Sequence, residues 1–273
     1  MYHFGLVGHP VNHSQSPSIH QEFLKFINVE GTYELYDVKE DELEALIRDL
    51  KRSGIDGFNV TVPYKEKVIP YLDHLDEQAK KLKSVNTIKR NGNQLIGYNT
   101  DGVGFCESLK QASPSFYEQL NKKSVLLLGA GGAAKGIYYS LQTRDPLRLD
   151  VANRTQLKAQ EITSSYTNSC SLTLQEAERY LNQYDLVIQT TTVGMVPNES
   201  EQIISLHNLA KDTIVCDIVY KPMWTRFLVD GQKQGGQLLF GEEMLWHQAA
   251  KAFKIWTGYS VEKSIKTNIE GRA

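Results

Sequence analysis

Short apolar runs alternate with amphipathic stretches through the first hundred residues. The apolar runs have the length and the flanking turn residues of strands, and the amphipathic stretches have the spacing of helices. The predicted strands cover 2–8, 32–38, 57–62, 84–90 and 94–100. Helices are predicted at 18–29 and at 41–54, where Gly54 supplies a stop signal. The alternation indicates βαβ units around a mostly parallel sheet, whose last two strands form a hairpin around Asn91-Gly92.

The pattern restarts after Lys123. Residues 123–142 predict an apolar strand, a glycine-rich turn and a helix, and further strands are predicted at 147–155, 184–195, 212–220 and 235–240. We therefore expect an α/β protein with two domains that meet near 103–113. The first is a substrate domain over 1–103 with a mostly parallel sheet, and the second is a Rossmann-like dinucleotide-binding domain over 104–241. A C-terminal helix is predicted from Glu242 to Trp256, and its pattern alone assigns it to neither domain.

Composition and charge narrow the class of protein. The chain has 273 residues, of which 41% are hydrophobic and 23% charged, with a formal net charge of -2. This balance gives no reason to expect nucleic acid or an acidic membrane surface as a partner. The sequence has neither a membrane-length apolar run nor a signal-peptide pattern, so we expect a soluble cytoplasmic monomer or homodimer that acts on a small molecule. The closing residues, IEGRA, resemble a protease-site remnant and are set aside.

Cysteine and histidine usage points away from disulfides and metal sites. Cys106, Cys170 and Cys216 are odd in number and far apart, without a CxxC spacing. We interpret them as three small apolar core residues in a reducing compartment. Three histidines near the N-terminus are interpreted as structural or surface residues rather than metal ligands: His9, His13 and His20.

A glycine-rich turn follows the first strand of the second half. Residues 129–134, GAGGAA, match G-x-G-x-x-A after an apolar strand and at the start of a helix, which is the context a dinucleotide site requires. Glycines let the backbone turn tightly and approach a pyrophosphate, and the helix N-terminus offers amide donors. The alternative is a turn that binds nothing. The expected cofactor-binding residues here are Gly129, Ala130, Gly131, Gly132 and Ala133.

The end of the second strand of this domain distinguishes between cofactors. NAD sites usually carry Asp or Glu about 20 residues after the glycine motif, where the carboxylate bonds the ribose hydroxyls. Here the strand ends in Asn153-Arg154-Thr155, with Lys158 one turn further, while Asp150 lies earlier and should point elsewhere. A guanidinium can hold a 2′-phosphate in bidentate fashion, whereas a carboxylate would repel it. We expect NADP rather than NAD, the alternative being that Arg154 is a solvated surface charge.

The stretch GFNVTVPYKEK, residues 57–67, carries polar groups at the end of a predicted strand. Val60 and Val62 alternate with polar residues, so on an extended chain the valines face the core. Asn59 and Thr61 then share the opposite face, and Lys65 follows after a proline that closes the run. We interpret the strand tip as presenting an amide, a hydroxyl and an amine to a substrate in the cleft between the two domains.

Other predicted strand ends of the first domain carry similar groups: Ser14, Ser16, Asn86 and Asp101. Hydroxyls and amides recognise alcohols, and two serines can hold a carboxylate, so the set suits a small polyhydroxylated substrate. Carbonyl reduction needs a donor that protonates the developing alkoxide, and a lysine oriented by an aspartate fits that need. Simpler interpretations stay open, because the serines could cap the helix near Pro17, Asp101 could cap the next helix, and Lys65 could be solvated.

The motifs HSQSPSIH, GFNVTVPYKEK, SVNTIK, GYNTDG, GAGGAAKG, NRT, DIVYKP and MLWHQAAKAF resemble, in order and spacing, those of shikimate dehydrogenases. The resemblance spans nearly the whole chain. It implies reversible, NADP-linked reduction of 3-dehydroshikimate to shikimate, on the route to chorismate and the aromatic amino acids. It also implies that C-terminal helices over 242–268 return to the substrate domain.

The same resemblance assigns roles to individual residues. It implies Lys65 and Asp101 as the catalytic pair. The implied substrate-binding residues are Ser14, Ser16, Asn59, Thr61, Lys65, Asn86, Asp101, Tyr220 and Gln248. The expected cofactor contacts beyond the glycine motif are Asn153, Arg154, Thr155, Lys158, Thr191, Val219 and Gly241. No metal is expected.

Two positions depart from the pattern of that family. Gln189 stands where the family usually has Asn, and the longer amide could shift the loop near the nicotinamide. Lys158 stands where Arg is frequent, which keeps the charge but loses the bidentate fork. Two other functions stay open. One is a quinate/shikimate dehydrogenase that uses NAD or both cofactors, and the other is a non-catalytic dinucleotide sensor, which the presence of Lys65 and Asp101 disfavours.

Overall fold

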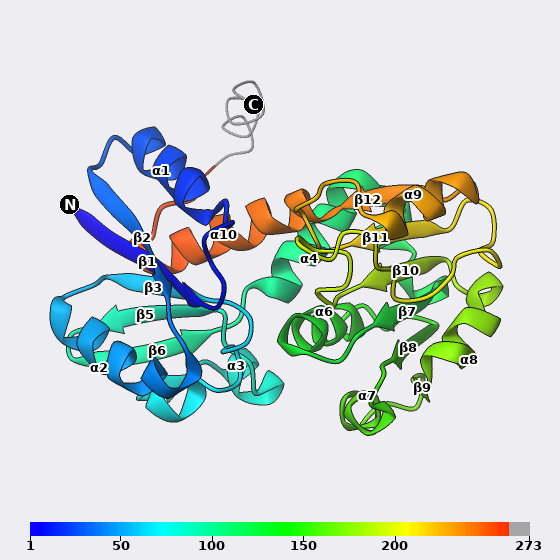
Figure 1. Ribbon diagram of the computed structural model, residues 1–273, viewed down its shortest axis with the longest axis horizontal. Coiled ribbons are helices and arrows are strands. Elements are labelled where there is room, and N and C mark those ends of the chain that lie inside the picture. The colour runs from blue at the N-terminus through cyan, green and yellow to red at the C-terminus, as the bar shows by residue number, and fades with distance from the viewer. Residues whose placement is uncertain (262–273) are drawn as a thin grey trace. The chain divides into compact units, whose positions relative to one another are not determined.

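The computed structural model describes residues 1–261 and contains two compact units (Figure 1). Among the described residues, unit 1 comprises 1–101 and 248–261, and unit 2 comprises 102–247. The chain passes between them inside two helices, α4 (Asp101–Ala112) and α10 (Gly241–Thr257). The helix predicted from Glu242 to Trp256 is therefore confirmed as α10. α10 ends at Thr257, and residues 258–261 are not helical. The rest of the region expected to be helical, 262–268, and the closing IEGRA lie outside the described residues.

Unit 1 is built on a six-stranded sheet with the order β2-β1-β3-β5-β6-β4. Its strands are β1 (Tyr2–Gly8), β2 (Gly31–Asp37), β3 (Gly57–Val60), β4 (His74–Leu75), β5 (Thr87–Asn91) and β6 (Gln94–Tyr98). The β1–β2, β1–β3 and β4–β6 pairs are parallel, which confirms the predicted mostly parallel sheet. The β5–β6 pair is antiparallel and closes at Asn91 and Gln94, which confirms the predicted hairpin.

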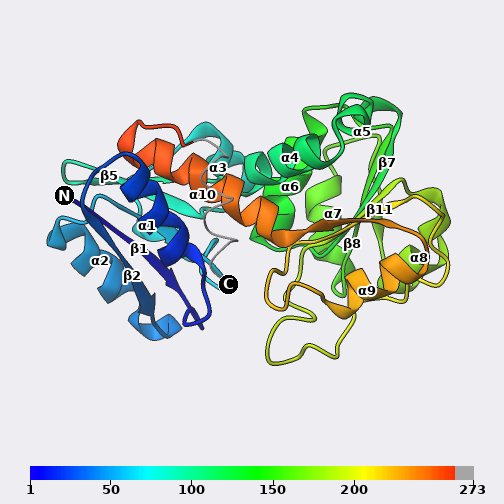
Figure 2. The ribbon, with the colours of Figure 1, turned by 90° about the horizontal axis from the view of Figure 1, so that it is seen from above.

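Helices cover both faces of this sheet (Figures 1 and 2). They are α1 (Ser16–Phe26), α2 (Leu43–Ser53), α3 (Glu77–Leu82) and the second half of α10. Helix α2 ends at Gly54, whose φ of 84° is the left-handed conformation that the predicted stop requires. On the face opposite α2, the Trp256 indole of α10 stacks on Phe4 of β1 with ring centroids 4.6 Å apart. Residues 1–101 thus share a core with the C-terminal segment.

The strand at GFNVTVPYKEK is shorter than its alternation predicts. β3 ends at Val60, and all four of its residues are buried because helices pack on both faces of the sheet. Val62 lies in the turn beyond the strand and is 50% exposed, so the prediction that it faces the core is wrong. In a sheet that is covered on both sides, alternation of apolar and polar residues does not report which side faces solvent.

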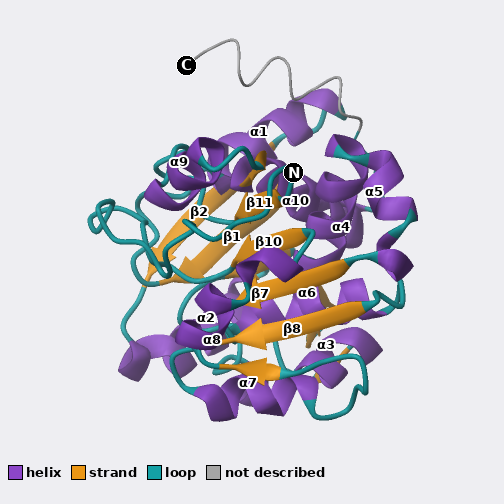
Figure 3. Ribbon diagram, turned by 90° about the vertical axis from the view of Figure 1, so that its right-hand side faces the viewer, coloured by secondary structure: helices purple, strands orange, loops and turns teal. Residues whose placement is uncertain are grey.

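Unit 2 has a six-stranded sheet with the order β12-β11-β10-β7-β8-β9, in which every neighbouring pair is parallel. The strands are β7 (Ser124–Leu128), β8 (Arg148–Ala152), β9 (Ser171–Leu172), β10 (Leu186–Gln189), β11 (Ile214–Asp217) and β12 (Gln237–Phe240). Figure 3 shows β7, β8, β10 and β11 side by side. The order reverses between β7 and β10, as in doubly wound dinucleotide-binding domains, which confirms the Rossmann-like prediction.

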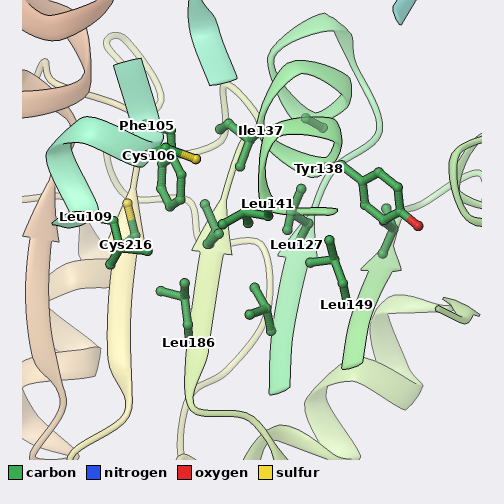
Figure 4. Close-up of a cluster of buried hydrophobic side chains, with 14 of the residues drawn as sticks. Phe105, Cys106, Leu109, Leu127, Ile137, Tyr138, Leu141, Leu149, Leu186 and Cys216 are labelled. Carbon is green, nitrogen blue, oxygen red and sulfur yellow. The ribbon is translucent and has the colours of Figure 1, made fainter. Parts of the chain in front are cut away.

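Helices of unit 2 lie on the two faces of its sheet and bury two hydrophobic clusters. One cluster joins the sheet to α4 and α6, and includes Phe105, Leu127, Ile137 and Leu141 (Figure 4). The other joins it to α8 and α9. The remaining helices are α5 (Pro114–Glu118), α6 (Gly132–Gln142), α7 (Gln156–Thr163), α8 (Leu174–Arg179) and α9 (Arg226–Lys233). Within residues 1–261, no helix is long and apolar enough to cross a membrane.

The cysteine prediction holds for two of the three side chains. Cys106 and Cys216 are buried in the cluster shown in Figure 4, where burial raises the pKa of both thiols. Cys170 is exposed, so its expected place in the core is wrong. It precedes the edge strand β9, and its backbone N–H donates to Asp150 Oδ1 at 2.8 Å, which places the backbone rather than the side chain in the packed region.

Candidate functional site

The polar residues expected at the substrate site gather at one edge of the unit 1 sheet. β1 and β3 run parallel, with Val7 beside Val60, so the segments that follow them leave the same edge. β5 is antiparallel to β3 and to β6, so the start of β5 and the end of β6 lie at that edge too. The residues brought there are Ser14, Ser16, Asn59, Thr61, Lys65, Asn86 and Asp101.

Lys65 and Asp101 form an ion pair at this edge. Lys65 Nζ donates to Asp101 Oδ2 at 2.7 Å, and the two side chains are only 14% and 5% exposed. The backbone around the lysine is fixed, because the Val85 N–H donates to the Lys65 carbonyl at 2.7 Å. The preceding side chain, Tyr64, is buried and donates from its hydroxyl to the Val38 carbonyl at 2.6 Å. The ammonium is therefore held in place before any ligand binds.

Asn86 connects this pair to neighbouring residues. Its Nδ2 donates to Asp101 Oδ1 at 2.9 Å and to Gln248 Oε1 at 3.3 Å, and its Oδ1 accepts from the Thr100 N–H at 2.8 Å. Asp101 is also the first residue of α4, where a negative charge is favoured by the helix dipole. The ion-pair interpretation of Asp101 is therefore confirmed, while a capping role of its side chain stays a prediction. Sequence reasoning missed Thr100, although it lies inside the GYNTDG motif beside Asp101.

Asn59 is built into the interior of the same network. Its Nδ2 donates to the Asn86 carbonyl and to Thr87 Oγ1, both at 3.1 Å, while its Oδ1 accepts from the Tyr33 hydroxyl at 2.8 Å. Each donor and the acceptor of the amide already has a protein partner, so its direct contact with substrate stays a prediction. Tyr33 was not singled out from the sequence, because the register that brings β2 next to β1 is not visible there.

Ser14, Ser16 and Thr61 surround the ends of β1 and β3. Ser14 Oγ accepts from the Ser16 N–H at 3.2 Å, in the turn that leads into α1. The N-cap position is Gln15, without a side-chain capping hydrogen bond, so the interpretation that the serines cap this helix is wrong. Ser16 is buried and Thr61 half-buried. A Cβ at Gly8 would lie 2.4 Å from the Thr61 methyl group, so only glycine allows this approach. Their expected contacts with a substrate carboxylate and hydroxyls remain predictions.

A buried histidine lies directly behind this network. His20 of α1 stacks on Tyr33 with centroids 4.7 Å apart and rings 10° from parallel, and it has no exposed surface. Neither ring nitrogen makes a hydrogen bond among the described residues, and the nearby polar side chain is Asn59. Burial lowers the pKa of His20 to about 3, with the Asn59 amide opposing the shift. The imidazole is therefore neutral in the folded protein.

This burial predicts a loss of stability in mild acid. In the unfolded chain His20 has a pKa of about 6.5 and is protonated below that pH, whereas in the folded protein it stays neutral down to about pH 3. The free energy of unfolding therefore falls as pH decreases from 6.5 toward 3. At about 1.36 kcal/mol per pH unit, the loss at pH 5 is about 2 kcal/mol. We expect His20→Phe, which keeps an aromatic ring, to remove this pH-dependent loss of stability when urea titrations at pH 7 and pH 5 are compared. The control His13→Gln replaces an exposed histidine and should show the same loss between pH 7 and pH 5 as the native chain.

The glycine-rich turn of unit 2 has the conformation that its motif requires. Gly129 has a φ of 117°, and a Cβ there would lie 2.5 Å from Thr190 Oγ1, so both conformation and space require glycine. Gly131 lies at the N-terminus of α6 with open space where a Cβ would stand. Ala134, the last residue of the motif, is buried in the core. Gly131 is exposed at the carboxyl end of β7, where a pyrophosphate site needs an accessible backbone.

The end of β8 carries the residues expected to select the cofactor. Arg154, Thr155 and Lys158 are exposed at the start of α7. Asn153 Nδ2 donates to the Thr155 carbonyl at 2.9 Å and shapes the turn. Asp150 is buried, and its carboxylate accepts from the Tyr184 hydroxyl at 2.6 Å and from the Cys170 N–H. The exposed end of this strand therefore presents positive charge and no carboxylate.

The remaining expected cofactor contacts lie at the carboxyl ends of β10, β11 and β12. Thr191 follows β10, Val219 and Tyr220 follow β11, and Gly241 follows β12. A Cβ at Gly241 would lie 2.5 Å from the Ile218 carbonyl oxygen, so glycine allows these two segments to touch. Gln248 lies in unit 1, bonded to Asn86 as described above.

Three family models match the chain in sequence order. The shikimate dehydrogenase substrate binding domain matches residues 6–88, and shikimate / quinate 5-dehydrogenase matches 110–220. The shikimate 5′-dehydrogenase C-terminal domain matches 241–260. The first lies within unit 1 and the second within unit 2, while the third covers the region of α10.

Individual relatives agree with these matches. The chain is 46% identical over 257 residues to a shikimate dehydrogenase (NADP(+)) of Bacillus licheniformis, covering 94% of this chain and 91% of that protein. The structure of Thermus thermophilus shikimate 5-dehydrogenase with NADP(H) and shikimate has a TM-score of 0.86 and 31% identity, covering 100% of this chain and 99% of the other. Quinate dehydrogenase of Corynebacterium glutamicum with NAD has a TM-score of 0.87 and 28% identity, covering 98% and 99%. The chain belongs to the shikimate dehydrogenase family.

Proposed function

We propose that this chain is an NADP-dependent oxidoreductase that interconverts 3-dehydroshikimate and shikimate, a step toward chorismate and the aromatic amino acids. Unit 1 binds the substrate and unit 2 binds NADP. The Lys65–Asp101 pair is the observation that carries the proposal, because it supplies a fixed proton donor among hydroxyl and amide groups. Its relatives in Bacillus carry the name of this reaction and of its cofactor.

The chemistry divides between the cofactor and the protein. When bound, NADPH supplies the hydride that reduces the carbonyl carbon. Lys65 donates a proton to the oxygen that gains negative charge, and Asp101 accepts a hydrogen bond from the ammonium and keeps it aimed. Asn86 donates a hydrogen bond to Oδ1, the other carboxylate oxygen of Asp101, so the carboxylate cannot rotate freely. In the oxidative direction Lys65 takes the proton back.

Substrate recognition falls to the side chains at the same sheet edge. Ser14 and Ser16 are proposed to bind the carboxylate, and Thr61, Asn86 and Gln248 the hydroxyls. Asn59 contributes by holding Asn86 and Thr87, and Tyr220 of unit 2 belongs to the same proposed substrate set. We place the protein in the cytoplasm as a monomer or a homodimer, which light scattering of the purified chain distinguishes.

Steady-state oxidation tests the proposal directly. The purified chain is assayed with shikimate and with quinate, each in the presence of NADP and of NAD. Turnover that is efficient only with shikimate and NADP supports the proposal. Efficient use of quinate or NAD instead supports a quinate/shikimate dehydrogenase that uses NAD or both cofactors, and a quinate dehydrogenase in complex with NAD has a similar fold. Binding of NADP without turnover of either substrate would indicate a dinucleotide sensor.

Removing Arg154 should change cofactor preference. A hydrogen bond to a charged group contributes about 1.5–3 kcal/mol, so Arg154→Ala is expected to raise the KM for NADP by about 10- to 100-fold. The KM for NAD should change by less than about twofold, because NAD has no 2′-phosphate for the guanidinium to bind. Arg144→Ala removes another exposed positive charge, after α6, and serves as the control. A similar loss with both cofactors would reject the assigned role.

A further inference from the structure

Two buried side chains link the segments that follow β10 and β11. Gln189 and Asp217 are the last residues of these strands and are partners in the sheet register. Gln189 Nε2 donates to Asp217 Oδ1 at 3.2 Å, and neither residue is more than 1% exposed. A buried amide and carboxylate at strand ends are costly unless every polar atom is bonded.

The buried Gln189 side chain holds the turn that follows β10. Its Nε2 also donates to the Val193 carbonyl at 3.0 Å, and its Oε1 accepts from the Thr191 N–H. A single amide therefore bonds both sides of the turn at 191–193. Thr191 Oγ1 in addition accepts from the Val193 N–H at 3.2 Å. The conformation of this turn depends on the length of the Gln189 side chain, because the amide must reach the turn and Asp217 together.

Asp217 fixes the second segment in the same way. Its Oδ1 accepts from the Val219 N–H at 2.9 Å, and its Oδ2 accepts from the Thr225 hydroxyl at 2.7 Å. Burial raises the pKa of Asp217 to about 7, and the Thr225, Val219 and Gln189 hydrogen bonds oppose that shift. All three neighbours donate hydrogen bonds to Asp217. These bonds favour its carboxylate form, whereas burial favours the neutral acid.

The topology of unit 2 indicates which part of the cofactor these two segments would contact. A doubly wound domain consists of two mononucleotide-binding halves that share a pyrophosphate site at the switch point. Here the switch point lies between β7 and β10, and the Arg154 segment at the end of β8 belongs to the half that takes the adenosine phosphate. The ends of β10, β11 and β12 form the other half, which takes the nicotinamide nucleoside.

We propose that the Gln189–Asp217 contact is a positioning device that shapes the nicotinamide half of the site without touching the reacting atoms. The proposal rests on the proposed NADP-dependent function and deepens it. Gln189 holds the turn at 191–193, Asp217 holds the segment at 218–219, and their shared hydrogen bond sets the spacing between the two. The network makes no contribution to the adenosine half at β8.

Two ligands that differ only in the nicotinamide half test this assignment. NADP and 2′,5′-ADP share the adenosine phosphate, and only NADP carries the nicotinamide nucleoside. Gln189→Met keeps the side-chain length and removes its hydrogen bonds. Because the turn at 191–193 then loses the hydrogen bonds that hold it, the Kd for NADP should rise about tenfold, while the Kd for 2′,5′-ADP stays within about twofold. Tyr184→Phe is the matched control, because it removes a buried hydrogen bond to Asp150 in the same sheet.

The outcomes separate the alternatives. A loss confined to NADP in Gln189→Met, and absent from Tyr184→Phe, supports the positioning role. Equal weakening of both ligands, or no weakening of either, overturns it, because a purely structural defect has no reason to select the nicotinamide half. Should Gln189→Met fail to fold, Gln189→Asn keeps the amide but cannot span both partners, and the same comparison applies with a smaller loss. A native chain that binds neither ligand would reject the proposed function itself, and this proposal with it.

Discussion

Replacing Lys65 with alanine is expected to lower kcat for shikimate oxidation by about 10²- to 10⁴-fold, the usual contribution of a positioned general acid or base. The Lys65 ammonium donates to Asp101 at 2.7 Å, and both side chains are largely buried, so bulk water replaces the ammonium poorly as a proton donor. The Kd for NADP should stay within about twofold, because Lys65 belongs to unit 1 and the expected cofactor residues to unit 2. Steady-state kinetics and cofactor titration measure the two quantities separately.

The chain offers a closely matched control two residues away. Lys67 is exposed and pairs with Glu40 at 2.5 Å, so Lys67→Ala removes the same charge from the same turn. Exposed ion pairs contribute little, and kcat should change by less than about twofold. An equal drop in both variants, or a parallel loss of cofactor affinity in Lys65→Ala, would refute the catalytic assignment.

The second large effect concerns stability. Trp256→Ala should lower the free energy of unfolding by about 3–5 kcal/mol, the range for deleting a buried aromatic side chain. Trp256 stacks on Phe4 of β1, and its Nε1 donates to the Ile88 carbonyl of β5 at 2.9 Å. A Cβ at Gly57 would lie 2.4 Å from the indole, so β3 is shaped around this ring as well. Urea titration followed by circular dichroism measures the loss.

Two further variants calibrate that measurement. Trp256→Phe keeps an aromatic ring and loses the hydrogen bond, so its cost should be well below that of alanine. Leu147→Ala removes an apolar side chain that is exposed, and its effect should be within about 0.5 kcal/mol. Should Trp256→Ala be no more costly than Leu147→Ala, the C-terminal segment would not be part of the unit 1 core.

Local signals explain which parts of the fold were predictable. The Asn91-Gly92 hairpin and the Gly54 helix stop both depend on residues that adopt conformations few others tolerate, so they are visible in sequence. The burial of Val62 was predicted wrongly because β3 ends at Val60, and the alternation that continues past it falls in a turn. Cys170 was misplaced because residue type alone does not distinguish an edge segment from a core strand.

The candidate site shows the same division. Lys65, Asn86 and Asp101 stand in short motifs at strand ends, and the structure brings them within hydrogen-bond distance. Tyr33 and His20 were not expected there, because they reach the site through the β1–β2 register and the packing of α1. Contacts between residues far apart in sequence depend on register and packing, which a single sequence does not display.

The shared core of unit 1 has a consequence for how the protein is made. Synthesis proceeds from the N-terminus, so Phe4 and Phe23 emerge from the ribosome long before Phe253 and Trp256, which pack against them. Unit 2 is continuous in sequence and can complete its own core in the meantime. The aromatic surface of the first segment therefore stays incomplete until the last helix has been synthesised.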